Sequence, residues 1–167
     1  LRLPAGHMHI SKTFEDCNWL QGLEGGIDSS HSSFAHRTFS NDAPSAGYYS
    51  YRNRSTAPRL EVMTTDWGYT YASIRHLKEE NQDFVRCYQF VMPFQQQRAG
   101  FVGMGPRKTE GVHGHVWVPI DDHQCWAWSI NFRPERPLTE QERADMTATN
   151  ANRTGPPKRL SRLSREA

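Results

Sequence analysis

The pattern of apolar and polar positions predicts a strand, a helix, a loop, a run of strands and a final helix. Residues 7–13 alternate well enough for a short strand. Over residues 14–31 the apolar side chains recur at helical spacing, with acidic residues near the start, which predicts a helix. Gly25 and Gly26 weaken this helix, and their presence suggests either close approach by another element or a local distortion.

The middle of the chain changes from a predicted loop to segments in which apolar and polar residues alternate with a period of two. Residues 40–58 are rich in Ser, Asn, Pro and Gly, which predicts a long loop of the kind that forms lids or binding loops. After it, β-branched and aromatic residues concentrate in five segments bounded by turn signals. The predicted strands are 59–65, 67–77, 83–94, 111–121 and 125–135. A helix over 137–151 follows, with Thr139 as N-cap and Glu142 at the capping-box position.

This order predicts an α+β domain in which a curved antiparallel sheet covers one or more helices. Short connections between successive strands favour an antiparallel meander. The chain has 167 residues, enough for one domain of ordinary size. Hydrophobic residues make up only 36%, but five Trp, eight Phe and six Tyr supply a large apolar area for a core.

The distribution of charge gives no reason to expect a nucleic-acid partner. The net charge is +2 at pH 7, but five basic residues in the last 18 positions face the single acid Glu166. That end carries +4 and the rest of the chain −2, whereas a nucleic-acid-binding body is basic. We therefore expect a domain over 1–150 and a basic, disordered tail over 151–167.

The sequence also gives no sign of a membrane partner or of an oxidising compartment. No stretch approaches the roughly 20 apolar residues that span a bilayer, and the N-terminus lacks a signal pattern. Cys17, Cys87 and Cys125 are odd in number and far apart. This spacing disfavours a disulfide framework and a thiolate metal site, and we expect a cytoplasmic protein.

Candidate chemistry gathers in the stretch GGIDSSHSSFAHR, which contains Asp28, His31 and His36. A mononuclear non-haem Fe(II) site needs two neutral imidazoles and one carboxylate on one face of the metal. On an ideal helix Asp28 and His31 lie on nearly one face, but His31 and His36 are about 140° apart. The two rings converge only if the helix ends or distorts between them, which the intervening serines favour. By itself, the pattern fits exposed or capping polar residues as well.

The wider sequence resembles the Rieske non-haem iron ring-hydroxylating oxygenases, and their phthalate dioxygenase-like branch in particular. CNWLQGLEGGIDSSHSSFAHR resembles the iron-binding helix of that family. PRLEVMTTDWGYTYASIRH resembles the following strand pair, and VWVPIDDHQCWAWSINFRPERPLTEQER resembles its strand–turn–strand leading to a helix. The resemblance covers about residues 7–145 and implies a helix-grip-like catalytic domain of the α subunit.

The resemblance assigns roles to individual residues. It makes His31 and His36 the two iron-binding histidines. Asp28 matches the acidic residue that bridges to a neighbouring subunit's Rieske cluster, where it would hold a ligand histidine in one tautomer. Asn18 and Glu24 match polar residues near the iron or the electron path, although ordinary helix polarity explains them equally well.

The chain departs from the family pattern in two ways. It has no Cys-x-His and Cys-x2-His pairs, so the Rieske domain is absent from this sequence. The third iron ligand, an Asp on a late helix, has no counterpart here. We therefore expect an incomplete catalytic domain that is inactive, or nearly so, on its own.

The resemblance also implies cofactors and partners. The complete protein would use Fe(II) and O2 to hydroxylate or demethylate an aromatic small molecule. Its electrons would come from NAD(P)H through a reductase and a [2Fe–2S] Rieske cluster. Because the electrons cross between subunits in the family, we expect a homotrimer, with no nucleic-acid or membrane partner.

Two other functions remain open from the residues alone. The sheet and helix could form a non-catalytic small-molecule binding module of helix-grip type. A zinc hydrolase would need a general-base Glu beside the histidines, and Glu24 stands seven residues before His31.

His113 and His115, like His7 and His9, alternate on strands and should form solvent-facing or pocket-lining pairs. The strand aromatics should pack in the core or line an aromatic pocket: Trp117, Trp126, Trp128, Phe90 and Phe94.

Overall fold

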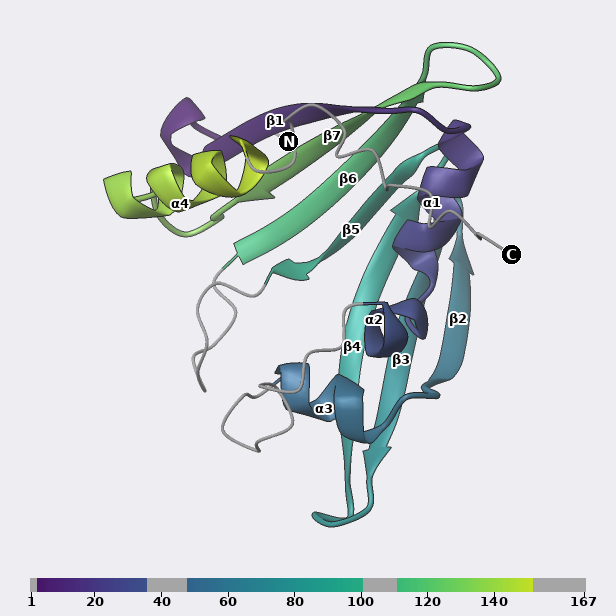
Figure 1. Cartoon of the computed structure of the whole chain (residues 1–167). Helices are drawn as coiled ribbons and strands as arrows, with labels where there is room; N and C mark the ends of the chain where they lie inside the picture. The colour runs from purple at the N-terminus through teal and green to yellow at the C-terminus, as the bar shows by residue number, and fades with distance from the viewer. Residues whose placement is uncertain (1–2, 36–47, 101–110, 152–167) are drawn as a thin grey trace, which may run out of the picture.

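The computed structural model describes residues 3–35, 48–100 and 111–151 (Figure 1). A 3-10 helix over Ala5–His7 comes first. The elements that follow are β1 (Met8–Glu15), α1 (Trp19–Ile27), α2 (His31–Phe34), α3 (Tyr48–Arg54), β2 (Arg59–Thr65), β3 (Gly68–Leu77), β4 (Gln82–Val91), β5 (Gln95–Gly100), β6 (Gly111–Pro119), β7 (Cys125–Phe132) and α4 (Glu140–Ala151).

Seven antiparallel strands form one sheet in the order β1-β7-β6-β5-β4-β3-β2. Strands β2 to β7 follow one another as a meander, and β1 pairs with β7 from Met8↔Phe132 to Glu15↔Cys125. Figure 1 shows a curved sheet with α1, α2 and α3 over one face and α4 beside β1. The predicted α+β fold with a curved antiparallel sheet over helices is therefore confirmed.

The prediction of a helix over residues 14–31 is wrong at its start, because β1 continues to Glu15. Phe14 and Glu15 lie opposite Trp126 and Cys125 in the ladder with β7. The Phe14 ring packs edge-on against the Trp126 ring at 5.7 Å. Pairing with a distant strand therefore overrides the local helical spacing.

The middle of the chain also differs from expectation. Residues 48–54, inside the loop expected over 40–58, form α3, and residues 36–47 lie outside the described part of the chain. The strand β5 was not predicted, because its QQQRAG sequence has no apolar alternation. Gln96 of β5 points inward, is 1% exposed, and donates to the Tyr71 hydroxyl at 2.9 Å.

The predicted capping box of the last helix is confirmed. The Glu142 backbone N–H donates to Thr139 Oγ1 at 3.2 Å, and the Thr139 N–H donates to Glu142 Oε2 at 2.9 Å. Hydrogen bonds from Arg136, the Thr139 N–H and Arg133 hold the pKa of Glu142 well below its usual range.

Of the described helices, none combines the length and apolar character needed to cross a bilayer.

Helix α1 packs closely on the sheet because two of its glycines touch Trp117. A Cβ on Gly22 would lie 2.7 Å from Trp117 Cδ1, and a Cβ on Gly26 would lie 2.8 Å from Trp117 Cζ2. The close approach suggested by the glycines is therefore real at Gly26, but a Cβ on Gly25 would meet nothing within 4 Å. The core between α1 and the sheet consists of Leu23 of α1 together with Phe90, Trp117, Cys125 and Ala127.

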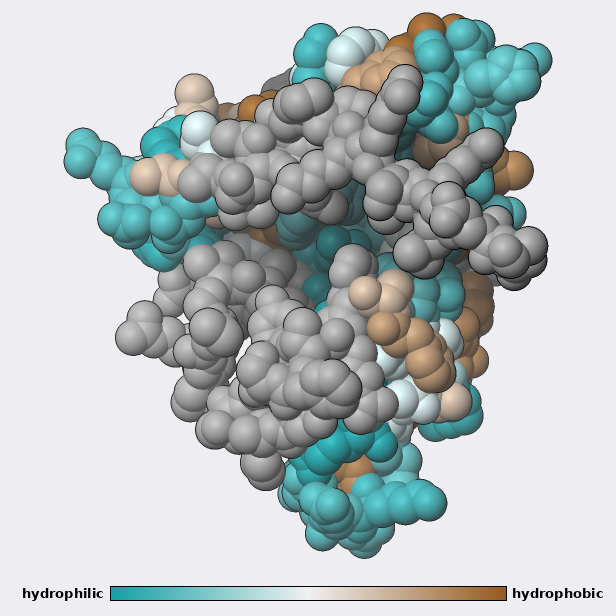
Figure 2. Space-filling model, viewed as in Figure 1, coloured by the Kyte–Doolittle hydropathy of each residue, from teal (hydrophilic) through white to brown (hydrophobic). Residues whose placement is uncertain are grey.

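One edge of the sheet leaves apolar side chains on the surface. Leu60, Val62 and Met63 of β2 are 50%, 63% and 65% exposed. Figure 2 shows apolar surface along this edge, on the right of the view. The core therefore lies under α1, toward the middle of the sheet, and a pocket lined by α1 and the sheet lies on the same side.

Candidate functional site

A pocket of about 320 Å³ lies between α1 and the inner face of the sheet. Its volume falls in the range of small-molecule sites. The wall includes Glu15 of β1, His31 of α2, Arg98 of β5, His115 and Trp117 of β6, and Ser129 of β7. Together with Gly22 and Gly26 of α1, residues from six elements converge on one cavity, and one of these residues, His31, is a predicted iron ligand.

The His31 ring is held by the backbone of Asp28. His31 Nδ1 lies 2.6 Å from the Asp28 carbonyl oxygen. A carbonyl oxygen only accepts, so Nδ1 carries the proton and the neutral ring presents the Nε2 lone pair. This is the tautomer that a histidine ligand needs when it binds metal through Nε2.

The Asp28 carboxylate has a structural role in the same turn. Its oxygens accept from the backbone N–H groups of Ser30 at 2.7 Å and His31 at 3.1 Å, at the start of α2. The sequence prediction that Asp28 fixes the tautomer of a histidine thus has a geometric counterpart, but through the carbonyl rather than the carboxylate. Asp28 is exposed, and its expected part in electron transfer stays a prediction.

The helix is interrupted twice: after Phe34, between positions 31 and 36, where a break is expected, and also after Ile27, where none is expected. The chain leaves α1 at Ile27, and α2 runs only from His31 to Phe34. Asp28 therefore stands in a turn and does not share a helix face with His31. His36, the second predicted iron ligand, lies outside the described residues, so its role also stays a prediction.

Polar side chains of the sheet bind the carbonyl groups that this interruption leaves without helical partners. Gln96 Nε2 donates to Gly26 O at 2.8 Å, Tyr71 Oη to Ile27 O at 3.0 Å, and Arg75 Nη2 to Ser29 O at 2.6 Å. Burial raises the pKa of Tyr71, so its phenol stays a donor at neutral pH. The turn before His31 is thus fixed to the sheet.

Asn18 and Glu24, the two loosely assigned polar residues, do not line the pocket. Asn18 is the N-cap of α1: its Oδ1 accepts from the Leu20 N–H at 2.8 Å, and its Nδ2 donates to Asp122 O at 2.9 Å. The Glu24 side chain is exposed. Their positions fit helix polarity, and their suggested roles near the iron or electron path stay predictions.

On the sheet side of the pocket, several polar side chains form a hydrogen-bonded network. Arg98 Nη2 donates to His115 Nε2 at 3.4 Å, so His115 carries its proton on Nδ1, which lies 3.2 Å from Ser129 Oγ. His113 Nε2 lies 2.8 Å from the same His115 nitrogen and competes with Arg98 for its single lone pair. The pocket-lining interpretation of His115 is confirmed. Sequence reasoning missed Arg98 because β5 itself was missed, although Gln96 and Arg98 do show a two-residue spacing.

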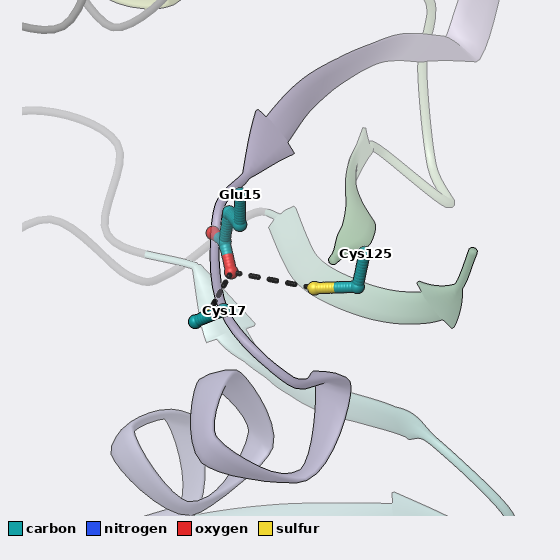
Figure 3. Close-up of side chains that lie close together, drawn as sticks. All are labelled: Glu15, Cys17 and Cys125. Atoms are coloured by element: carbon teal, nitrogen blue, oxygen red, sulfur yellow. Dashed lines mark hydrogen bonds between the residues drawn. The ribbon is translucent and has the colours of Figure 1, made fainter. Parts of the chain in front are cut away.

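A second cluster of polar side chains joins Glu15 to two cysteines (Figure 3). Glu15 Oε2 lies 4.0 Å from Cys17 Sγ and 3.9 Å from Cys125 Sγ. Burial, and then the charge of Glu15, raise the pKa of both thiols, that of Cys125 to about 12. The linear spacing of the cysteines gave no reason to pair them, because only the β1–β7 ladder brings them together.

Comparison with known proteins gives matches over most of the chain. Residues 3–148 match the family model described as "LigXa C-terminal domain like". The chain is 35% identical over 130 residues to the phthalate 4,5-dioxygenase oxygenase subunit of Pseudomonas putida, covering 71% of this chain and 28% of that protein. It is 28% identical over 148 residues to the 3-chlorobenzoate-3,4-dioxygenase oxygenase subunit of Comamonas testosteroni, covering 83% and 32%. The chain thus spans about a third of the length of these relatives.

Solved structures of low sequence identity share the fold. Dicamba monooxygenase aligns with a TM-score of 0.61 at 13% identity, over 90% of this chain and 46% of that one. NdmB of Pseudomonas putida CBB5 aligns with a TM-score of 0.56 at 14% identity, over 91% and 43%. From the family match and the 35% identical relative, we conclude that the chain belongs to the Rieske non-haem iron ring-hydroxylating oxygenases, as a LigXa C-terminal-like domain of the oxygenase subunit.

Proposed function

We propose that this domain binds ferrous iron and an aromatic acid within a Rieske-type oxygenase that hydroxylates or demethylates its substrate. One observation carries the proposal: the His31 ring lies on the wall of a pocket of about 320 Å³ in the tautomer suited to a metal ligand. The names of the relatives supply the reaction class, since both are dioxygenase oxygenase subunits.

The described residues include one of the two predicted iron-binding histidines, His31. His31 would bind iron through Nε2, while the Asp28 carbonyl keeps the ring in place. His36 would supply the second imidazole, as the family resemblance implies. When bound, the iron supplies the reductive activation of O2, with electrons from NAD(P)H through a reductase and a neighbouring subunit's [2Fe–2S] cluster in a trimer.

The pocket wall supports an aromatic acid as substrate. The relatives are named for phthalate and 3-chlorobenzoate, which are both aromatic carboxylates. Arg98 places a permanent positive charge on the wall, and the largely buried Trp117 contributes apolar atoms to it. In this arrangement Arg98 binds the carboxylate, while His115 holds the guanidinium through Nε2.

A zinc hydrolase has less support from the same geometry. Such an enzyme needs a carboxylate beside the metal to act as general base. The Glu24 side chain is exposed and does not line the pocket, and the Asp28 carboxylate is engaged by two backbone N–H groups. The Glu15 carboxylate does line the pocket, but it lies against two cysteine thiols.

Anaerobic Fe(II) titration of the chain tests the proposal. Wild type should bind about one Fe(II) weakly, and His31→Ala should abolish that binding because an imidazole ligand is lost. His76→Ala is the matched control, since His76 is an exposed β3 histidine whose ring pairs with Asp83 at 2.9 Å. Equal Fe(II) binding by wild type and His31→Ala would refute the iron site and favour a non-catalytic binding module.

A further inference from the structure

We propose that Glu15, Cys17 and Cys125 form a separate site for one thiophilic divalent cation, such as Zn²⁺ or Cd²⁺. This site is independent of the iron role proposed above. Within the described part of the chain, these residues bring one carboxylate oxygen and two sulfur atoms to within 4.8 Å of one another. Figure 3 shows the Glu15 carboxylate lying between the two cysteines.

The distances fit a tetrahedral ion after a small contraction. With Zn–S bonds of about 2.3 Å and a Zn–O bond of about 2.0 Å, tetrahedral ligand atoms are roughly 3.5–3.8 Å apart. The oxygen-to-sulfur distances in the cluster are 4.0 Å and 3.9 Å. The two sulfur atoms, which lie within 4.8 Å of each other, would close to about 3.8 Å around the ion. Each ligand atom therefore needs to move by about half an ångström or less, which side-chain rotation can supply.

The backbone holds all three ligands at one end of the sheet. Glu15 and Cys125 are directly opposite each other in the β1–β7 ladder, and Cys125 is fully buried. Cys17 follows two residues after Glu15, and the next residue, Asn18, donates to Asp122 O in the β6–β7 turn at 2.9 Å. The segment that carries Cys17 is therefore tied to the turn that precedes Cys125.

The ligand set selects the class of cation. Two sulfur ligands favour Zn²⁺ and Cd²⁺ over Mg²⁺ and Ca²⁺, which prefer oxygen. Three protein ligands leave one of the four tetrahedral positions for water. Because Glu15 also lines the pocket of about 320 Å³, water can reach this position from the pocket.

Binding is an exchange of protons for the cation and involves no oxidation. Without metal, both thiols are neutral and lie within weak hydrogen-bond distance of the Glu15 carboxylate. The cation forms two metal–sulfur bonds and one metal–oxygen bond, and the two thiol protons leave to solvent. The bound group of one divalent cation, two thiolates and one carboxylate has a net charge of −1.

Cadmium titration of the reduced chain tests the site, with ultraviolet absorption from thiolate-to-Cd²⁺ charge transfer as the readout. Wild type should bind one Cd²⁺ per chain with this absorption. Cys17→Ser should weaken binding by roughly 100-fold, because one of three protein ligands is lost. Cys87→Ser is the matched control, since Cys87 is an exposed cysteine on β4 outside the cluster, and it should bind like wild type.

Two further measurements keep the result decisive. Cys125→Ser should also lose the absorption, but Cys125 is fully buried, so folding is first checked by circular dichroism. If that variant unfolds, alkylation of wild type decides: Cd²⁺ should slow modification of Cys17 and leave Cys87 unchanged. Unchanged Cd²⁺ absorption in Cys17→Ser, or no protection of Cys17, would overturn the proposal. Cd²⁺ at His31 gives no thiolate absorption, so this result does not depend on the iron site.

Discussion

Replacing Gly26 with alanine should destabilise the fold, whereas the same change at the adjacent Gly25 should stabilise it. A Cβ on Gly26 would lie 2.8 Å from Trp117 Cζ2 and closer still to Cη2. Trp117 is 5% exposed in the core, so its ring has little room to move away. A Cβ on Gly25 would meet no atom within 4 Å.

The magnitude follows from two opposing effects. Alanine in a helix interior is favoured over glycine by about 0.5–1 kcal/mol. Overpacking a filled core costs about 1–3 kcal/mol. Gly25→Ala should therefore gain about 0.5–1 kcal/mol, and Gly26→Ala should lose about 0.5–2 kcal/mol. Because both positions lie in α1, helix propensity cancels in the difference between the two variants.

Urea unfolding followed by circular dichroism measures both free energies of unfolding. Adding Trp117→Phe to Gly26→Ala should recover part of the loss, since a smaller ring makes room for the methyl group. That recovery, measured as the coupling in a double-mutant cycle, identifies the contact as the cause. Equal stability of Gly25→Ala and Gly26→Ala would show that α1 does not approach Trp117 as described.

The remaining predictions concern acid stability and substrate binding. The pKa of Glu142 is lowered by Arg136 and Arg133, so its stabilising contribution is complete above its ordinary pKa of 4.5 and is lost progressively as pH falls below it. Glu142→Gln should lower the free energy of unfolding at pH 7 by about 1–3 kcal/mol and flatten its decline in acid; a pH profile parallel to wild type contradicts this. Arg98→Gln should weaken phthalate binding, followed by Trp fluorescence, by roughly 10- to 150-fold through loss of a charge-assisted hydrogen bond. Arg86→Gln on β4 should leave phthalate binding unchanged. Equal weakening in both variants would show that Arg98 does not bind the carboxylate.

The sequence predicts the strands with a strong alternation and misses the one without it. The five strands expected between residues 59 and 135 are all present, because each alternates apolar or β-branched side chains. The strand β5 has three consecutive glutamines, and its place in the sheet depends on hydrogen bonding to β4 and β6. Such pairing is a tertiary property that local periodicity cannot show.

The residues of the site also differ in how far the sequence predicts them, because some depend on local contacts and others on distant ones. His31 could be singled out because its neighbours in sequence also surround it in the turn. Glu15 and Cys125 are 110 residues apart and meet only through the β1–β7 register. No spacing in the sequence could have paired them, since the register depends on the whole meander between them.

The orientation of His31 depends on residues far from it in the chain. A continuous helix would satisfy its own carbonyl groups, whereas the break after Ile27 leaves several of them without helical partners. Each buried carbonyl left unpaired would cost about 1–3 kcal/mol, so an interruption facing an apolar sheet would be strongly disfavoured. Here the sheet presents three buried donors at that place, which are Tyr71, Arg75 and Gln96. The polar residues of β3 and β5 therefore make the break energetically acceptable, and the break lets the Asp28 carbonyl orient the His31 ring toward the pocket.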